Sequence, residues 1–250
     1  MGTRPTRSWS SIPAASELLL IVALTSCATS AMHPDLLAGS SQAVVVTTAS
    51  WSDTNGSLQR YERHAGSWKA VGVPTAIVTG RTGLAWAGGL LNEAAPADAP
   101  VKREGDGKSP AGIFALGTTF GFEASSPFRL PYKQLRDATE CVDDSASMYY
   151  NTVVDRDAVP RVDWSSSEKM RTIDQYRWGA VILHNTPPKP AGGSCIFLHI
   201  WGGPSSTTSG CTAMSQQDLE TLLRWLDPAA NPRLVQLPRG EYERLRAHLP

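Results

Sequence analysis

The sequence predicts a mainly β domain, a sandwich or barrel with a few short helices. Its 250 residues include 21 glycines and 18 prolines, and this composition is typical of many turns between short strands. Long helical patterns are scarce, so the spacing of the apolar runs indicates antiparallel neighbours and not β-α-β repeats. A chain of this length can bury a sizeable core without needing disulfides for bulk stability.

The first half of the chain supplies a hairpin and several further strands. The β-branched residues 44–48 predict the first strand,. A turn signal at residues 53–56 lets residues 57–63 pair back on it,. Further strands are expected at 68–73 and 75–79, which Pro74 separates, and at 111–116, with turns at 80–83 and 86–89.

The second half mixes strands with short helices. Ser165 and Glu168 match a capping box, which predicts a short helix within 163–170,. Ser215 and Asp218 cap a helix whose leucines share one face,. Strands are expected at 149–154, 179–184, 194–199 and 234–237, and helices at 219–226 and 241–248.

The N-terminus predicts export. Arg4 and Arg7 precede an apolar run at 18–24 that is too short to span a bilayer and suits a secretory signal,. The run ends in a sequence that resembles a lipobox, with Cys27 as the acylated first mature residue. The alternative is a plain signal peptide cut after Ala31. We therefore expect a signal peptide at 1–27, a tether at 28–42 and a catalytic domain at 43–250, located in the periplasm or cell envelope and attached to the membrane by a lipid.

Charge and cysteine number narrow the function further. Lys+Arg and Asp+Glu are equal at 23 each, and this balance argues against nucleic acid as a partner. Without Cys27 three cysteines remain, an odd number for an oxidising compartment. One interpretation is a Cys141–Cys195 disulfide with Cys211 free. The other is three unpaired thiols, two of them buried as small apolar residues.

An imidazole and a thiol lie close together in the sequence between residues 195 and 214. His199 ends an apolar strand, and Gly210 and Cys211 follow a loop rich in Gly, Pro, Ser and Thr. Cys211 as nucleophile and His199 as base are the minimal parts of a cysteine acyl-transfer site. The capped helix beyond Cys211 is expected to offer amides that lower the thiol pKa. The alternative is a buried histidine beside a structural thiol.

A zinc site formed by Cys195, His199, Cys211 and His184 is the other chemistry considered. Cys195 and His199 are four positions apart along a strand, or ~13 Å. That is too far for both to bind one metal ion. We therefore expect neither a metal nor a cofactor.

Two motifs resemble those of the YkuD-type L,D-transpeptidase domain. The family signature is a histidine, a spacer and Ser/Thr-x-Gly-Cys, and His199 with residues 208–211 matches it. The loop at 102–114 is similar to the family's Gly-Asp-x-x-Thr-Pro-x-Gly-x-Phe element, with Ser109 in place of Thr. The resemblance covers roughly residues 43–237.

The resemblance implies a peptidoglycan L,D-transpeptidase. In the family the cysteine attacks a stem tetrapeptide, D-alanine leaves, and the acyl group passes to an amine on a second stem. Carried over, Cys211 is the nucleophile, His199 the base oriented by a backbone carbonyl, and the amides of Gly210 and Cys211 the oxyanion donors. Water as acceptor would make the chain an L,D-carboxypeptidase. An inactive wall-binding lipoprotein is the alternative from another class.

The chain departs from the family pattern around the motif. Ile200 follows the histidine where Gly is usual, the spacer is shorter, and Ala213 stands where a substrate-side Arg is usual. Other polar groups are therefore expected to bind the donor stem. The candidates are Ser209, Thr208, Trp201, His184 and Asn185, with Tyr150 and Asn151 also considered. Asp163 and Glu168 are interpreted as capping or surface groups.

Overall fold

The computed structural model describes residues 1–4, 35–91 and 93–250. The chain divides into two compact units, Met1–Met32 and His33–Pro250, and the fold described below is that of the second. The predicted signal sequence and Cys27 lie outside the described residues. In the part of the chain that the structure describes, no helix is long and apolar enough to cross a membrane.

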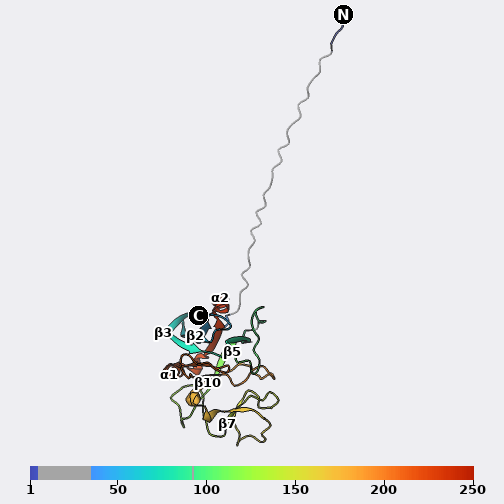
Figure 1. Ribbon diagram of the computed structural model, residues 1–250. Helices are drawn as coiled ribbons and strands as arrows, with labels where there is room; N and C mark the ends of the chain where they lie inside the picture. The colour runs from blue at the N-terminus through green and yellow to red at the C-terminus, as the bar shows by residue number, and fades with distance from the viewer. Residues whose placement is uncertain (5–34, 92) are drawn as a thin grey trace. The chain divides into compact units, whose positions relative to one another are not determined.

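A ten-stranded sheet forms a barrel-like ring (Figure 1). Its strands follow the order β10-β11-β12-β3-β2-β1-β13-β5-β4, and β5 also pairs with β10, which closes the ring. β6 adds to β5 at the outside. The strands are β1 Gln42–Thr48, β2 Asn55–His64, β3 Ser67–Val78, β4 Leu84–Gly89, β5 Ser109–Gly121, β6 Tyr132–Gln134, β10 Trp178–Ile182, β11 Phe197–Ile200, β12 Thr212–Met214 and β13 Arg233–Pro238.

The predicted fold class is confirmed, but the strands are not all antiparallel. The hairpin β1–β2 and the pair β10–β11 are antiparallel as expected. The pairs β1–β13, β4–β5 and β11–β12 are parallel. The β11–β12 pair lays the strand that carries His199 beside the strand that follows Cys211.

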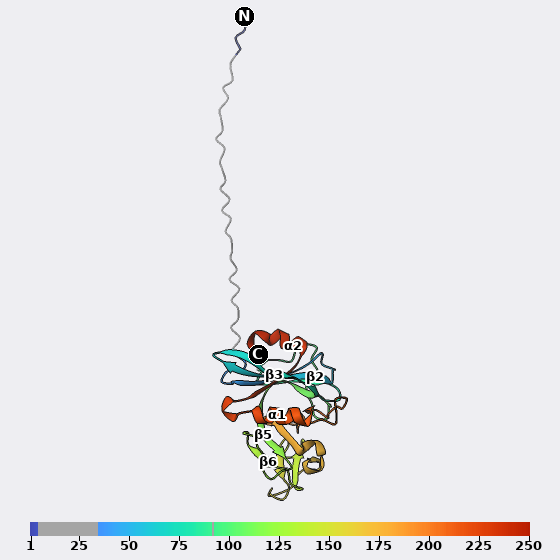
Figure 2. The ribbon, with the colours of Figure 1, turned by 90° about the vertical axis from the view of Figure 1, so that its left-hand side faces the viewer.

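Both faces of the sheet are buried. Along β1, Val44 and Val46 pack into one core, while Ala43 and Val45 pack into another, as the two-residue period of a strand requires. Helix α1 (Gln216–Trp225) covers the first face and packs on β10 and β11. Helix α2 (Arg239–Leu245) covers the second and packs on β13 and β1. Figure 2 shows the two helices on opposite sides of β2 and β3.

The prediction of a helix within 163–170 is wrong. Residues Ser167–Lys169 form β9, which pairs with β7 (Thr139–Val142) in a separate three-stranded sheet with β8 (Val153–Asp155). Ser165 caps nothing, because its amide and hydroxyl both donate to Asp144 Oδ2. Pairing across the sheet overrides the local capping signal. Only the short 3₁₀ turns η1 (Met170–Thr172) and η2 (Asp174–Arg177) follow.

Other boundaries differ for identifiable reasons. Pro74 does not end a strand: β3 runs through it at an irregularity opposite β2, where a missing N–H is tolerated. Residues 86–89, expected as a turn, belong to β4. The strand expected at 149–154 shortens to β8. In the expected tether, Leu37 is buried in the second core and Asp35 pairs with Arg63.

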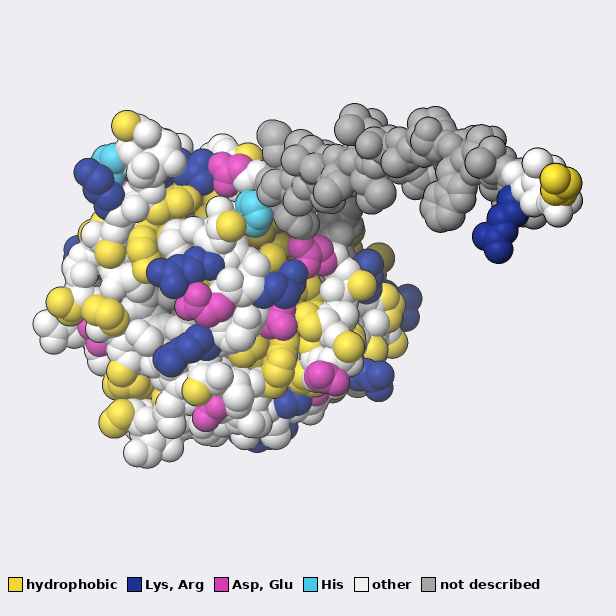
Figure 3. Space-filling model, turned by 90° about the horizontal axis from the view of Figure 1, so that it is seen from above, with side chains coloured by type: hydrophobic (Ala, Val, Ile, Leu, Met, Phe, Trp, Pro, Cys, Tyr) yellow, Lys and Arg dark blue, Asp and Glu magenta, His cyan; other side chains and the backbone are white. Residues whose placement is uncertain are grey.

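Helix α1 has the predicted cap. The Ser215 side chain accepts a hydrogen bond from the Asp218 amide, and Leu219, Leu222 and Leu223 are buried on one face. The last helix, expected at 241–248, is α2 followed by a 3₁₀ turn, η4 (Arg246–His248). On the face seen in Figure 3, positive and negative side chains are interspersed with apolar ones.

Candidate active site

A cleft of about 680 Å³ opens beside the ends of β11 and β12. Its wall combines the His199 and Cys211 segments with the loop before β5 and with residues of the three-stranded sheet and η2. The residues that line it are Arg81, Lys102, Glu104, Gly105, Asp143, Glu168, Ile173, Gln175, Tyr176, Ser194–Ile196, His199, Trp201, Gly202 and Ser206–Cys211.

Cys211 lies at the inner wall of the cleft and is buried. The amide of Phe197 donates to its Sγ at 3.3 Å, and the thiol donates to the carbonyl of Cys195 at 3.5 Å. Cys195 is joined to Cys141 by a disulfide, so Cys211 is the free cysteine among the described residues. Burial raises the pKa of the Cys211 thiol, and the nearby Glu168 charge raises it further. The thiol is therefore neutral in the resting protein.

The helix expected next to Cys211 is displaced by a strand. Residues Thr212–Met214 form β12, and α1 begins only at Gln216. Helix-terminal amides therefore do not activate the thiol, contrary to the sequence expectation. The amide of Phe197 on the neighbouring strand β11 is the donor that faces the sulfur.

His199 is held on β11 by its own backbone. Its Nδ1 lies 2.7 Å from the carbonyl oxygen of Ile200, and a protonated Nδ1 leaves Nε2 as the proton acceptor. The Tyr176 ring meets the imidazole edge-on, with centroids 5.2 Å apart. Burial lowers the pKa of His199 to about 4. The imidazole is therefore neutral at physiological pH, the form that a general base requires.

The loop before β5 fixes the backbone of Cys211. Ser109 Oγ donates to the Cys211 carbonyl at 2.8 Å and accepts from the Gly80 amide at 2.9 Å. Asp106 organises the loop by accepting hydrogen bonds from Lys102 Nζ and from the Lys108 amide. The two sequence motifs thus form one hydrogen-bonded unit.

Later residues of the same motif hold β5 in the sheet. Gly112 has φ +149°, and a Cβ there would lie 2.4 Å from the carbonyl oxygen of Gly88 on β4. Only glycine allows such a close approach between these strands. Phe114 is fully buried in the core beneath. These two residues support the fold, whereas Ser109 contacts the site.

Thr208 and Gly210 shape the turn before the cysteine. Thr208 Oγ1 donates to the Cys211 carbonyl at 2.6 Å and accepts from the Gly210 amide at 3.1 Å. Gly210 has φ +151°, and a Cβ there would approach Ile196 Cδ1 to 3.0 Å and Lys108 O to 3.1 Å. The amide of Gly210 is therefore already engaged inside the turn.

The structure brings together most of the candidate residues. Cys211, His199, Gly210, Ser209, Thr208 and Trp201 line one cleft. His184 and Asn185 line a second cleft, also about 680 Å³, which shares Lys102 with the first. Asn185 Nδ2 binds the carbonyls of Lys189 and Gly193, and His184 is buried with Nε2 3.1 Å from Gly192 O.

Tyr150 and Asn151 brace the segment before Cys195. The Tyr150 hydroxyl donates to Glu104 Oε2 and accepts from the Gly193 amide. Asn151 Oδ1 accepts the amide of Cys195 at 3.1 Å. Neither residue lines the cleft that contains Cys211. Both side chains therefore bond to residues of the cleft wall, Glu104 and Cys195, without lining the cleft themselves.

The four residues that were considered and rejected as zinc ligands do not form a cluster that could hold a metal ion. Cys195 is in the disulfide, which removes it from the zinc set considered above. Among residues 1–4, 35–91 and 93–250, no group of three or more His, Cys, Asp or Glu side chains is placed to hold a metal ion.

The position of the usual family arginine is closed to a long side chain. Ala213 is fully buried on β12, between His199 of β11 and Val78 of β3. A cation reaches the cleft from elsewhere: Arg81, at the turn between β3 and β4, is exposed, and its Nη1 lies 3.2 Å from Ser209 Oγ. The described residues provide no salt-bridge partner for Arg81.

Sequence reasoning also missed Glu168 and Tyr176. Glu168, interpreted as a capping residue, comes from β9 and lines the cleft. Tyr176, from η2, is buried against Phe197 and His199. No local motif marks either residue, because the fold brings them to Cys211 from more than thirty positions away in the sequence. The only local signal at Glu168 was the capping pattern, which pointed elsewhere.

A family model connects this arrangement with known proteins. The L,D-transpeptidase catalytic domain, YkuD, matches residues 48–235, well over half of the chain. No match was found among the curated proteins or among the solved structures. The matched range contains His199, Cys211 and the loop before β5. The chain therefore belongs to the YkuD family of L,D-transpeptidase catalytic domains.

Proposed function

We propose that the protein is a peptidoglycan L,D-transpeptidase with Cys211 as its nucleophile. The observation that carries this proposal is a buried thiol and a neutral, backbone-oriented imidazole that line the same cleft. In this mechanism Sγ attacks the donor carbonyl of a stem tetrapeptide while His199 Nε2 takes the thiol proton. The imidazolium then protonates the departing D-alanine amine, which leaves a thioester on Cys211.

The proton moves during attack and not before it. Burial raises the pKa of Cys211 and lowers that of His199 to about 4, so a preformed thiolate–imidazolium pair is disfavoured. As negative charge grows on Sγ, the hydrogen bond from the Phe197 amide strengthens,. The site is thus arranged for general-base assistance to a thiol.

The turn at Gly210 determines which backbone amide can bind the substrate oxyanion. The Gly210 amide binds Thr208 Oγ1, so it would have to exchange that partner to reach a substrate oxygen. We assign the amide of Cys211 as the principal donor and Gly210 as the residue that permits the turn. A single such donor contributes about 2.7–4 kcal/mol where one has been removed from other enzymes.

Arg81 is our candidate for recognition of the donor stem. Its guanidinium lies at the cleft beside Ser209, and a planar guanidinium matches a carboxylate group,. It would take the role that the buried Ala213 cannot perform. Ser209, Thr208 and Trp201 complete the wall around the reacting carbonyl.

Product masses test this function directly. The protein and a Cys211→Ala variant are incubated with purified tetrapeptide muropeptides. Dimers that form only with Cys211 support transpeptidation, and tripeptide with free D-alanine but no dimer supports the L,D-carboxypeptidase alternative. Absence of both products across several donors refutes the enzyme and leaves the wall-binding protein.

We also propose that the chain acts in the cell envelope, attached by a lipid at Cys27. The proposal rests on the apolar run at 18–24 and the residues before Cys27,. Expression of the full chain and of a Cys27→Ala variant tests it by mass spectrometry. A mature N-terminus at Cys27 with a diacylglycerol mass is expected, and cleavage after Ala31 in both proteins would contradict it.

A further inference from the structure

Tyr176 links the nucleophile to a carboxylate that the mechanism has not used. Its hydroxyl donates to Glu168 Oε2 at 2.8 Å, and its ring packs edge-on against His199 at 5.2 Å. Burial raises the pKa of Cys211, and the charge of Glu168 adds to the rise. Glu168 therefore lies within electrostatic reach of the reacting sulfur.

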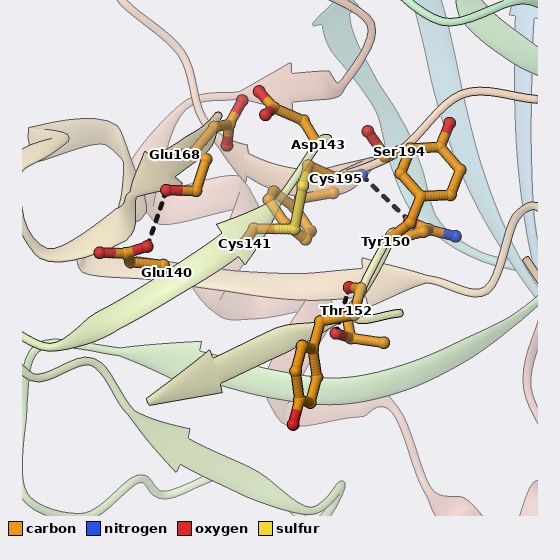
Figure 4. Close-up of a disulfide and its surroundings, with 12 residues drawn as sticks. Glu140, Cys141, Asp143, Tyr150, Thr152, Glu168, Ser194 and Cys195 are labelled. Atoms are coloured by element: carbon orange, nitrogen blue, oxygen red, sulfur yellow. Dashed lines mark hydrogen bonds between the residues drawn. A yellow bond between two sulfur atoms is a disulfide. The ribbon is translucent and has the colours of Figure 1, made fainter. Parts of the chain in front are cut away.

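Of the three carboxylates that line the cleft, Glu168 and Asp143 each accept one side-chain hydrogen bond and Glu104 accepts two. Glu104 accepts hydrogen bonds from the hydroxyls of Tyr150 and Ser194, and Asp143 accepts one from Ser166. Among the described residues, Glu168 has Tyr176 as its side-chain partner and forms no salt bridge. Figure 4 shows Glu168 and Asp143 on the same side of the Cys141–Cys195 disulfide.

The surroundings let Glu168 hold a proton near neutrality. Burial raises its pKa to about 7, the hydrogen bond from Tyr176 opposes the rise, and the charges of Asp143 and Glu104 add to it. The titratable groups that face it are these three and Cys211. Lys102, which lines the same cleft, is already paired with Asp106 at 2.6 Å.

Transfer to an amine requires the removal of two protons. An alkyl amine has a pKa of about 10.4, so fewer than roughly one molecule in a thousand is unprotonated at pH 7. The ammonium must lose one proton before it can attack and another as the amide forms. His199 can take only one of them. A second base in the cleft therefore has a defined task in transpeptidation and none in hydrolysis.

We propose that Glu168 is the base for the acceptor ammonium, held in position by Tyr176, an inference that rests on the proposed function. The Glu168 carboxylate attracts the ammonium and takes its first proton. The amine lone pair then attacks the thioester carbonyl carbon, and His199 Nε2 takes the second proton. The C–S bond breaks, and Sγ regains its proton from the imidazolium. Glu168 finally releases its proton to solvent.

The test measures how the acyl-enzyme divides between amine and water. The full chain receives a tetrapeptide donor with an amine-bearing acceptor stem. Released D-alanine counts acylation, and the ratio of dimer to tripeptide reports the division. Glu168→Gln should lower this ratio at pH 7 by about 10²-fold or more, the usual contribution of a general base, while the acyl-enzyme and its first equivalent of D-alanine still form. Asp174→Asn is the matched control, because Asp174 is an exposed carboxylate on η2 outside the cleft.

The pH profile separates a base from a structural role. Transfer by the wild type should rise with a midpoint near pH 7, the pKa of Glu168, whereas Glu168→Gln should rise only as free amine accumulates toward pH 10. Tyr176→Phe keeps the ring packing and removes the hydrogen bond that lowers the Glu168 pKa, so its midpoint should move upward. Thermal melting of each variant checks that it is folded.

The outcomes distinguish this inference from the function on which it rests. D-alanine release by the wild type with an unchanged dimer-to-tripeptide ratio in Glu168→Gln would overturn the role of Glu168 and leave the acyl-transfer function intact. Hydrolysis without any dimer in the wild type would overturn it as well. No D-alanine release by the wild type would refute the proposed function itself.

Discussion

Replacing Ser109 by alanine tests the connection between the two sequence motifs. The Ser109 hydroxyl is fully buried, donates to the Cys211 carbonyl and accepts from the Gly80 amide. In the variant, the Cys211 carbonyl keeps its hydrogen bond from Thr208. The Gly80 amide loses its acceptor inside the protein. The variant therefore removes one shared partner and leaves one buried donor unsatisfied.

The expected loss of stability follows from the Gly80 amide, which has no acceptor in the variant. A buried donor without a partner costs about 1–3 kcal/mol, so the free energy of unfolding should fall by that amount. For a domain of this size each kcal/mol lowers the melting temperature by about 2–4 °C. We therefore expect a decrease of roughly 2–12 °C. Acylation by Cys211 should slow as well, because the carbonyl of the nucleophile loses one of its two anchors.

Urea unfolding and D-alanine release together measure both effects. Ser109→Ala, Thr208→Val and the double variant form a cycle around the Cys211 carbonyl, which the two hydroxyls share. The double variant should lose more stability than the sum of the singles, since only it leaves this carbonyl without either hydroxyl. Ser109→Thr, which restores the hydroxyl, is the control. Unchanged stability and acylation in Ser109→Ala would show that the loop does not support the nucleophile.

Three further predictions concern the turn, the thiol and acid stability. Gly210→Ala should lose most acylation activity and unfold at lower urea concentration, because its Cβ would strain the backbone at φ +151° and press on Ile196; wild-type behaviour would contradict the assigned turn. Cys211 should react slowly with iodoacetamide at pH 7.5 when native and rapidly when unfolded, since burial raises its thiol pKa, and peptide mapping would expose fast native labelling as a counterexample. Burial raises the Asp155 pKa, but hydrogen bonds from Thr139, Lys133 and Arg136 outweigh it and lower the pKa from 3.8 to about 2. The Asp155 carboxylate therefore stabilises the fold above about pH 4, and this contribution disappears toward pH 2. Asp155→Asn should flatten stability over this window, and an unchanged slope would argue against it.

The strands that could be predicted from sequence are those whose own residues favour extended structure. β-branched and apolar runs gave β1, β10, β11 and β13 close to their observed positions. β9 could not be predicted, because its three residues are extended only through pairing with β7. The local capping pattern of this segment favoured a helix, but pairing with β7, more than twenty residues away in the sequence, makes it a strand.

The residues of the candidate site also fall into two groups, those that a local motif predicts and those that only the fold brings to the cleft. His199, Gly210 and Cys211 lie in one short stretch whose chemistry is visible in the residue types. Tyr176 and Glu168 reach the cleft only through the arrangement of η2 and the three-stranded sheet. His184 and Asn185 end a neighbouring strand as expected, yet they line the second cleft. Being near in strand order did not place them in the same cleft as Cys211.

If Cys211 carries the acyl group, peptide masses of a trapped acyl-enzyme will locate the adduct on this residue. The protein is mixed with a tetrapeptide donor without acceptor, quenched in acid within seconds, and digested for peptide mapping. We expect an adduct on Cys211 equal to the donor mass minus D-alanine, present in Glu168→Gln and absent in Cys211→Ala. An adduct on another residue, or tripeptide formation by Cys211→Ala, would contradict it.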